Sequence, residues 1–159
     1  MSNWSELRSA ADIELLVEVF DRFHGACLKE VLVRSGASVD ADYRMTVPFK
    51  RDLTAFLYFQ RPRRAPASIE LRLSEVLRVE LDPTDNGRGS IIDRADLSLD
   101  AQGRFVFVID FDCASPLPGH RAGYRVCCGL AAWRAIDGLG ADDRYARAGL
   151  AQGKDVAGT

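Results

Sequence analysis

The segment Ile69–Leu81, with the sequence IELRLSEVLRVEL, constrains the fold of this chain more than any other feature. Apolar and polar side chains alternate along it, and successive residues of a β-strand point to opposite faces of a sheet. The alternation therefore predicts an antiparallel sheet with one dry face and one wet face. Glu75 and Val76 break the pattern, since each falls on the wrong face. Two adjacent violations predict a bulge or a break at Ser74–Val76.

Other segments share this two-residue period and predict further strands. They span residues 26–34, 43–49, 52–60, 90–100, 103–113 and 124–136. The turn-forming sequence DAQG between the fourth and fifth of these predicts a hairpin. Pro48 cannot donate a backbone hydrogen bond, so the strand 43–49 is expected at a sheet edge. The connections are too short for parallel crossovers, which predicts antiparallel pairing throughout.

A helix is predicted at the N-terminus, over Asn3–Phe23. Apolar residues recur there at helical spacing, and Asn3 with Glu6 three residues later resembles a capping box. Asp12 interrupts the apolar stripe and could split the segment in two. Gly25 supplies the permissive backbone on which helices commonly end.

These elements together predict an α+β fold. We expect the N-terminal helix to pack on a mostly antiparallel β-sandwich or curled sheet of seven to eight strands. A single domain is expected over residues 1–136, followed by a tail, 137–159, that is partly helical or frayed.

The charge balance excludes several classes of function. The net charge of −2 gives no field that would draw the chain to nucleic acid or to an anionic membrane. One basic loop, FQRPRRAP, offers Arg61, Arg63 and Arg64 as candidate binding residues, but a single loop is a small footprint for nucleic acid. No segment approaches the ~20 apolar residues that cross a bilayer, and the N-terminus lacks the features of a secretory signal. A cytoplasmic location is therefore expected.

Neither a metal site nor a cofactor is predicted. The four cysteines include no C-x-x-C pair, and Cys127 and Cys128 are adjacent, so they should point to opposite faces of a strand. They are interpreted as free, mostly buried thiols. Oxygen, nitrogen and sulfur ligands near residues 110–120 match no known ligand spacing.

The candidate catalytic residues are His24, Glu75, Asp110 and Asp112. An acid–base enzyme would gather them in one cleft, with the pKa values of the carboxyl groups shifted. Asp110 and Asp112 share a strand face, where they could bind a cation or transfer protons, or simply be solvated at the end of the strand. His24 stands at a helix end, where it could instead bond free carbonyl groups.

The chain also resembles a family in the segments FHGACLKEVLV, IELRLSEVLRVEL, IIDRADLSLD, GRFVFVIDFDC and AAWRAI. They are similar to a loose group of small bacterial proteins, some of them grouped with the immunity proteins of toxin systems. Those proteins begin with a helix that ends in Phe-His-Asp, and here Gly25 follows Phe23 and His24 in place of the Asp. The resemblance implies a single-domain protein that binds another protein, and it brings no catalytic residues.

We therefore predict a protein-binding module of the immunity type. Its partner would be another protein or a second copy of the chain, bound through an exposed sheet edge such as Tyr43–Phe49. The alternative is a small enzyme or ligand-binding protein that uses His24 and the nearby carboxylates.

Overall fold

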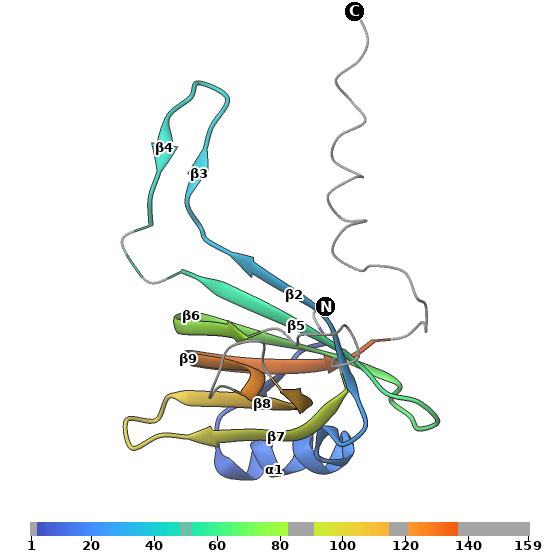
Figure 1. Ribbon diagram of the computed structural model, residues 1–159. Helices are drawn as coiled ribbons and strands as arrows, with labels where there is room; N and C mark the ends of the chain where they lie inside the picture. The colour runs from blue at the N-terminus through green and yellow to red at the C-terminus, as the bar shows by residue number, and fades with distance from the viewer. Residues whose placement is uncertain (1–2, 49, 51, 83–90, 115–120, 137–159) are drawn as a thin grey trace, which may run out of the picture.

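The computed structural model describes residues 3–48, 50, 52–82, 91–114 and 121–136. It confirms the predicted α+β class, with one N-terminal helix and a mostly antiparallel seven-stranded sheet beside a small second sheet (Figure 1). The elements follow in the order β1 (Ser5–Leu7), α1 (Ala10–Val19), the 3₁₀ turn η1 (Asp21–Phe23), β2 (Cys27–Arg34), β3 (Ser38–Val39), β4 (Met45–Thr46), β5 (Thr54–Gln60), β6 (Ser68–Asp82), β7 (Ile92–Leu99), β8 (Phe105–Ala114) and β9 (Arg121–Ala135). The predicted tail, 137–159, lies outside the described residues.

The main sheet curls until its two outer strands meet at one end. Its order is β2-β5-β6-β9-β8-β7, with β1 added to the far half of β9. At the start of β2, Cys27 forms a bridge with Ile91. The Ile92 N–H donates to the Ala26 carbonyl at 2.8 Å, and the Gly25 N–H donates to the Ile92 carbonyl at 3.3 Å. Of the two predicted architectures, the structure is therefore the curled sheet.

The predicted irregularity in the sequence IELRLSEVLRVEL is confirmed as a bend within one long strand. Glu75 has a φ of 55°, and the register with β9 shifts between Val76 and Arg78. Gly129 of β9 lies across from this bend, where an added Cβ would stand 2.6 Å from Glu75 Oε2. Position 129 therefore has little room for a side chain while Glu75 keeps this conformation.

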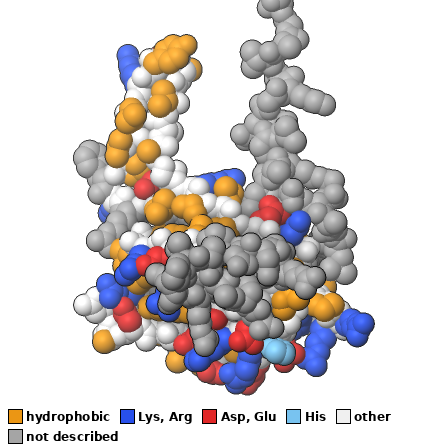
Figure 2. Space-filling view, in the orientation of Figure 1, with side chains coloured by type: hydrophobic (Ala, Val, Ile, Leu, Met, Phe, Trp, Pro, Cys, Tyr) orange, Lys and Arg blue, Asp and Glu red, His pale blue; other side chains and the backbone are white. Residues whose placement is uncertain are grey.

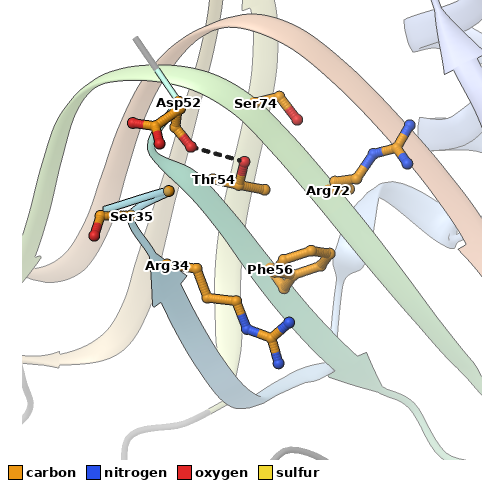
Figure 3. A pocket seen from close by; sticks show the side chains of 8 residues that line it. Arg34, Ser35, Asp52, Thr54, Phe56, Arg72 and Ser74 are labelled. Carbon is orange, nitrogen blue, oxygen red and sulfur yellow. Dashed lines mark hydrogen bonds between the residues drawn. The ribbon is translucent and has the colours of Figure 1, made fainter. Parts of the chain in front are cut away.

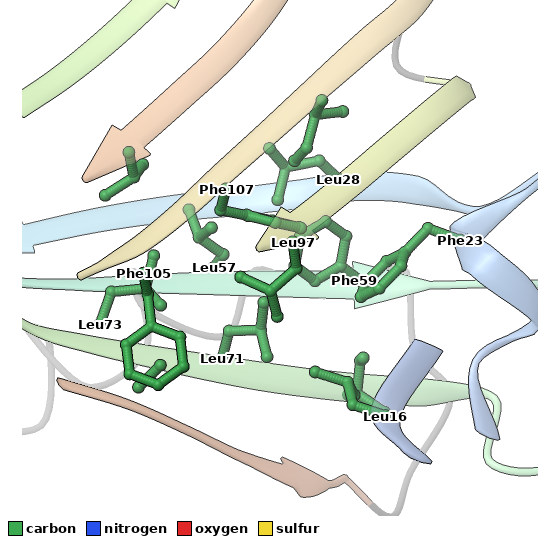
Figure 4. Close-up of a cluster of buried hydrophobic side chains, with 14 of the residues drawn as sticks. Leu16, Phe23, Leu28, Leu57, Phe59, Leu71, Leu73, Leu97, Phe105 and Phe107 are labelled. Carbon is green, nitrogen blue, oxygen red and sulfur yellow. The ribbon is translucent and has the colours of Figure 1, made fainter. Parts of the chain in front are cut away.

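The core lies inside the curl, where α1 and η1 face β5, β6 and β8 (Figure 4). Four phenylalanines meet there at edge-to-face or tilted angles. The Phe23 ring centroid is 5.0 Å from that of Phe59 and 5.6 Å from that of Phe107, and Phe20 lies 5.1 Å from Phe23. The apolar side chains predicted to share one face of β5 and one face of β8 are buried, which confirms the alternation of both strands.

The prediction of one helix over Asn3–Phe23 is wrong in its first third. Residues Ser5–Leu7 pair with β9, and the N-cap of α1 is Ser9, whose Oγ accepts from the Asp12 N–H at 3.3 Å. Asp12 Oδ2 in turn accepts the Arg8 N–H and the Ser9 hydroxyl, both at 2.8 Å. These hydrogen bonds, the Arg8 N–H first, lower the pKa of the Asp12 carboxyl. Asp12 interrupts the apolar stripe of the sequence, and in the structure it completes the N-terminal cap of α1.

The strand predicted over 43–49 is shorter than expected and does not join the main sheet. Only Met45–Thr46 is strand, paired with Ser38–Val39 in a separate two-stranded sheet. We call residues 37–48 the arm, because this hairpin projects well away from the rest of the molecule (Figure 1). The remainder of the described chain is called the body.

Candidate functional site

The predicted catalytic residues lie on separate elements. His24 is exposed and ends η1, while Glu75 is exposed at the bend of β6. Asp110 is half-buried on β8, opposite Gly123 of β9. Asp112 also belongs to β8, but its side chain lies outside the described set. No hydrogen bond or ion pair joins His24, Glu75 and Asp110. Within the described residues, no three His, Cys, Asp or Glu side chains are close enough to share a metal ion.

The three arginines of the basic loop have different roles in the structure. Arg61 is 7% exposed, and its guanidinium donates to the carbonyl groups of Val19, Ala65 and Pro66 at 2.9–3.0 Å. Its Cζ lies 4.5 Å from the centroid of the Phe20 ring. Burial, and then the nearby charge of Arg64, lower the pKa of this guanidinium. Arg61 therefore holds the end of α1 to the loop and offers no surface for a partner.

Arg63 and Arg64 remain on the surface of the loop. Arg63 is exposed with a φ of 62°, and Arg64 pairs with Asp21 at 2.5 Å, both side chains more than half exposed. Exposed pairs of this kind contribute little to stability, because water screens them. Of the predicted binding arginines, these two are the ones left accessible.

The described cysteines are free thiols, and the adjacent pair Cys127 and Cys128 differs in burial, as expected for neighbours on a strand. Cys128 is buried, and burial raises the pKa of its thiol to about 12. Cys127 and Cys27 are half-buried free thiols. Cys127 and Cys128 thus point to opposite faces of β9. The side chain of Cys113 is not among those described.

The outer face of the sheet carries a cluster of aromatic rings and charges that the sequence analysis missed. Two guanidinium groups cover the Trp4 ring, with Arg72 Cζ 4.7 Å and Arg134 Cζ 4.4 Å from its centroid. Arg134 donates twice to Glu70 Oε2, at 2.6 and 2.8 Å, and Glu70 is 2% exposed. Arg72 also pairs with Glu6 of β1 at 2.9 Å. This cluster fastens the N-terminal strand to β6 and β9.

Beside this cluster, a hollow of about 350 Å³ opens where the arm joins the sheet (Figure 3). Its lining comes from the end of β2, the start of β5 and the middle of β6. The lining residues are Arg34, Ser35, Gly36, Asp52, Thr54, Phe56, Arg72 and Ser74. Alternation in the sequence places Thr54 and Phe56 on the wet face of β5, but nothing in it shows that Arg34 and Arg72 line the same hollow.

Arg34 and Asp52 are the two charged groups of the hollow that have no ionic partner within the described part of the chain. Arg34 is exposed, its Cζ lies 5.8 Å from the centroid of the Phe56 ring, and no described residue forms an ion pair with it. Asp52 Oδ2 is buried without a hydrogen bond from the described chain, against the backbone of Gly36. An added Cβ at Gly36 would stand 1.7 Å from that oxygen, so position 36 admits only glycine while Asp52 keeps this place.

The arm is the most exposed apolar part of the described chain. The exposed fraction is 58% for Val39, 91% for Tyr43, 72% for Met45 and 61% for Val47. Figure 2 shows these hydrophobic side chains along the length of the arm. Each fraction is far above that of a core residue, so the apolar surface of the arm faces solvent.

Comparison of this chain with known protein families, with curated proteins and with solved structures gives no match. The structure adds one negative finding on membranes: among the described residues, no helix has the length and apolar character to span a bilayer. The arm and the hollow at its root are the two features from which we infer a function.

Proposed function

We propose that this chain is a protein-binding module and that the arm is the element that enters the partner. The observation that carries the proposal is the amphipathic hairpin of the arm. In an antiparallel pair, residues directly opposite each other point to the same face, and Val39 is opposite Met45. Val47 falls on that face too, two residues after Met45. Ser38 and Thr46 occupy the other face. The arm thus has one apolar face and one polar face.

An apolar face of this kind needs a second layer. A lone two-stranded hairpin is marginally stable in water, and it becomes stable when its apolar face packs against another surface. Within the body, the equivalent faces are covered by α1 or by facing strands. No described residue covers the apolar face of the arm, since its side chains are 58–72% exposed. Contiguous exposed apolar surface marks interaction sites in soluble proteins.

The apolar area of the arm is close to what one side of a specific interface contains. Four exposed apolar side chains offer on the order of 400 Å², if full burial of each one removes about 100 Å². One side of a specific, stable interface covers about 800 Å², of which a little over half is apolar. The arm can therefore supply the apolar part of such an interface. We infer that the partner is a different protein, in keeping with the immunity-like group that the sequence resembles, and photo-crosslinking distinguishes it from a second copy of the chain.

Site-specific photo-crosslinking tests this proposal. A photoreactive residue at position 45 should form an adduct with one discrete protein in an extract of the native cell. The same residue at position 15, which is 57% exposed on α1, serves as the matched control and should not form it. Unlabelled chain should compete for the adduct, and a chain with Val39→Ser, Met45→Ser and Val47→Ser should fail to compete.

Three results would contradict the proposal. They are no adduct specific to position 45, equal competition by the triple variant, and an adduct with a second copy of the chain alone. Identification of the adduct as a toxin encoded beside this gene would extend the proposal to immunity, the role that the resemblance implies. A turnover of small molecules that depends on His24 would favour the enzyme alternative instead.

A further inference from the structure

We propose that the hollow at the root of the arm receives a carboxylate side chain of the partner protein. The inference rests on the proposed function, because the hollow becomes part of the interface only if the arm is bound. Chain connectivity makes the two surfaces continuous. Arg34, Ser35 and Gly36 lead into the arm, and Asp52 and Thr54 lie on the return path to the sheet. A protein that binds Val39 and Met45 and extends to the root of the arm would also cover this hollow.

The chemistry of the hollow selects an acidic group. Arg34 carries a planar fork of donors, which matches the two oxygens of a carboxylate. The Phe56 ring beneath it limits the positions that the guanidinium can take, and Arg72 adds a second positive charge to the wall. The hydroxyl of Ser74 lines the same space, while that of Thr54 already donates to the Asp52 carbonyl at 3.4 Å (Figure 3). A carboxylate at this place would have the two guanidinium groups and the Ser74 hydroxyl as donors.

The charged groups that face the hollow have opposing effects on such a ligand. Arg34 attracts it, and Arg72 attracts it less, since Glu6 already pairs with Arg72. Asp52 repels it, because its carboxylate lines the hollow and has no ionic partner among the described residues. In Figure 3, Asp52 lies with Ser35 and Thr54, whereas the Arg34 and Arg72 guanidinium groups lie away from Asp52, on different sides of Phe56. The carboxylate should therefore bind away from Asp52, against Arg34.

This arrangement predicts effects of opposite sign for two substitutions. Arg34→Gln keeps length and hydrogen bonding but removes the attracting charge, so affinity for a carboxylate should fall roughly fivefold, the upper end for an exposed ion pair. Asp52→Asn keeps the shape against Gly36 but removes the repelling charge, so affinity should rise. Arg94→Gln, an exposed arginine of β7, is the matched control and should change nothing.

The probe is the blocked amino acid N-acetyl-glutamate methylamide, titrated into the full chain at low salt. Its binding is followed by the NMR shifts of the backbone amides of Thr54, Phe56 and Ser74. We expect shifts that fit a single weak site with a dissociation constant on the order of tens of millimolar, because ion pairs at exposed sites are weak. The neutral analogue, N-acetyl-glutamine methylamide, should leave these amides unmoved.

Several outcomes would overturn the inference. Equal shifts from the acidic and neutral probes would show that charge is not recognised. An Asp52→Asn variant that binds no better, or an Arg34→Gln variant that binds no worse, would contradict the arrangement of charges. Tighter binding of inorganic phosphate than of the carboxylate would identify a different anion as the ligand.

The crosslinking experiment keeps this inference separate from the proposed function. If position 45 captures a partner and the glutamate probe does not bind, the inference about the hollow is wrong and the proposed function stands. If the probe binds and position 45 captures nothing, the hollow is a site for a free carboxylate, and its assignment to a partner is wrong. If both succeed, Arg34→Gln should weaken capture of the partner, and Arg94→Gln should leave it unchanged.

Discussion

Apolar and polar side chains alternate in both the body and the arm, but the apolar face is buried in the body and exposed to solvent in the arm. Leu71 and Leu73 of β6 alternate with polar neighbours and are both 0% exposed. Val39 and Met45 of the arm follow the same alternation and are 58% and 72% exposed. The difference is the second layer, which α1 and the facing strands supply to the body. Alternation therefore predicts which side chains share a face, but not what covers that face.

The largest expected difference between the two regions is in amide hydrogen exchange. The Leu71 amide lies in β6 between two neighbouring strands, so its exchange should require opening of the whole fold, at about 5–15 kcal/mol for a domain of this kind. The Asp40 amide bonds only to the Arg44 carbonyl, at 3.0 Å within the arm, and should exchange by local fraying. We expect protection factors that differ by more than about a thousandfold.

Exchange measured at two protein concentrations provides the check on this comparison. Protection of Asp40 close to that of Leu71 would mean that the arm is covered in solution. If that protection rose with concentration, the covering surface would be a second copy of the chain. Either result would contradict the description of the arm as an open surface.

A substitution in the core should have the next largest effect. Phe59 is fully buried between the rings of Phe23 and Phe107, so Phe59→Ala should lower the free energy of unfolding by about 3–5 kcal/mol. Met45→Ala in the arm should change it by less than about 0.5 kcal/mol, because no packed contacts are lost. Urea unfolding of both variants measures the difference. If Phe59→Ala does not fold, Phe59→Leu should still unfold at lower urea than the wild type.

The basic loop offers a similar comparison at a smaller scale. Arg61→Met leaves the carbonyl groups of Val19, Ala65 and Pro66 without their donor, which should cost about 2–3 kcal/mol of unfolding free energy. Arg63→Met, in the same loop but exposed, should cost almost nothing. Thermal or urea unfolding distinguishes the two variants. Equal small effects would contradict the assignment of Arg61 as the residue that joins the loop to α1.

Local patterns were enough to predict most of the body. The faces of β5, β6 and β8, the bend at Glu75 and the antiparallel order all follow from alternation and short connections. The start of α1 could not be predicted in this way, because Leu7 and Ala11 fit a helical stripe as well as they fit a strand followed by a cap. The pairing of Leu7 with Ala131, far along the chain, is a tertiary contact that decides between the two.

The candidate site was predictable only in part. The sequence indicated Tyr43–Phe49 as a segment that could bind a partner, but its separation from the main sheet depends on where β2 ends and where β5 begins. The hollow combines β2, β5 and β6, and no spacing in the sequence indicates that Arg34 and Arg72 line it together. The sequence indicated Arg61 as a candidate binding residue because it is basic. Its burial depends on contacts with Val19 and Phe20, about 40 positions earlier. Such arrangements arise from tertiary contacts, which local patterns do not record.

The smallest effect tests the boundary between β1 and α1. Ser9→Ala removes the side chain that caps α1 and should lower the free energy of unfolding by about 1 kcal/mol. Asn3→Ala should have no such effect, although Asn3 is the residue that the periodicity favours as the cap. Urea unfolding of the two variants compares the positions directly. A larger loss for Asn3→Ala would contradict the placement of Ser5–Leu7 in the sheet.

The dependence of this effect on pH follows from Asp12, which shares the cap with Ser9. Its folded pKa is lowered by hydrogen bonds from the Arg8 N–H and then from Ser9, while in the unfolded chain the pKa keeps its ordinary value of 3.8. A lowered folded pKa means that the stabilisation is complete above pH 3.8 and is lost as the pH falls through the folded value. In the Asp12→Asn variant, the free energy of unfolding should therefore fall less steeply as the pH is lowered. Asp42→Asn, on the arm, serves as the control and should leave this dependence as it is in the wild type.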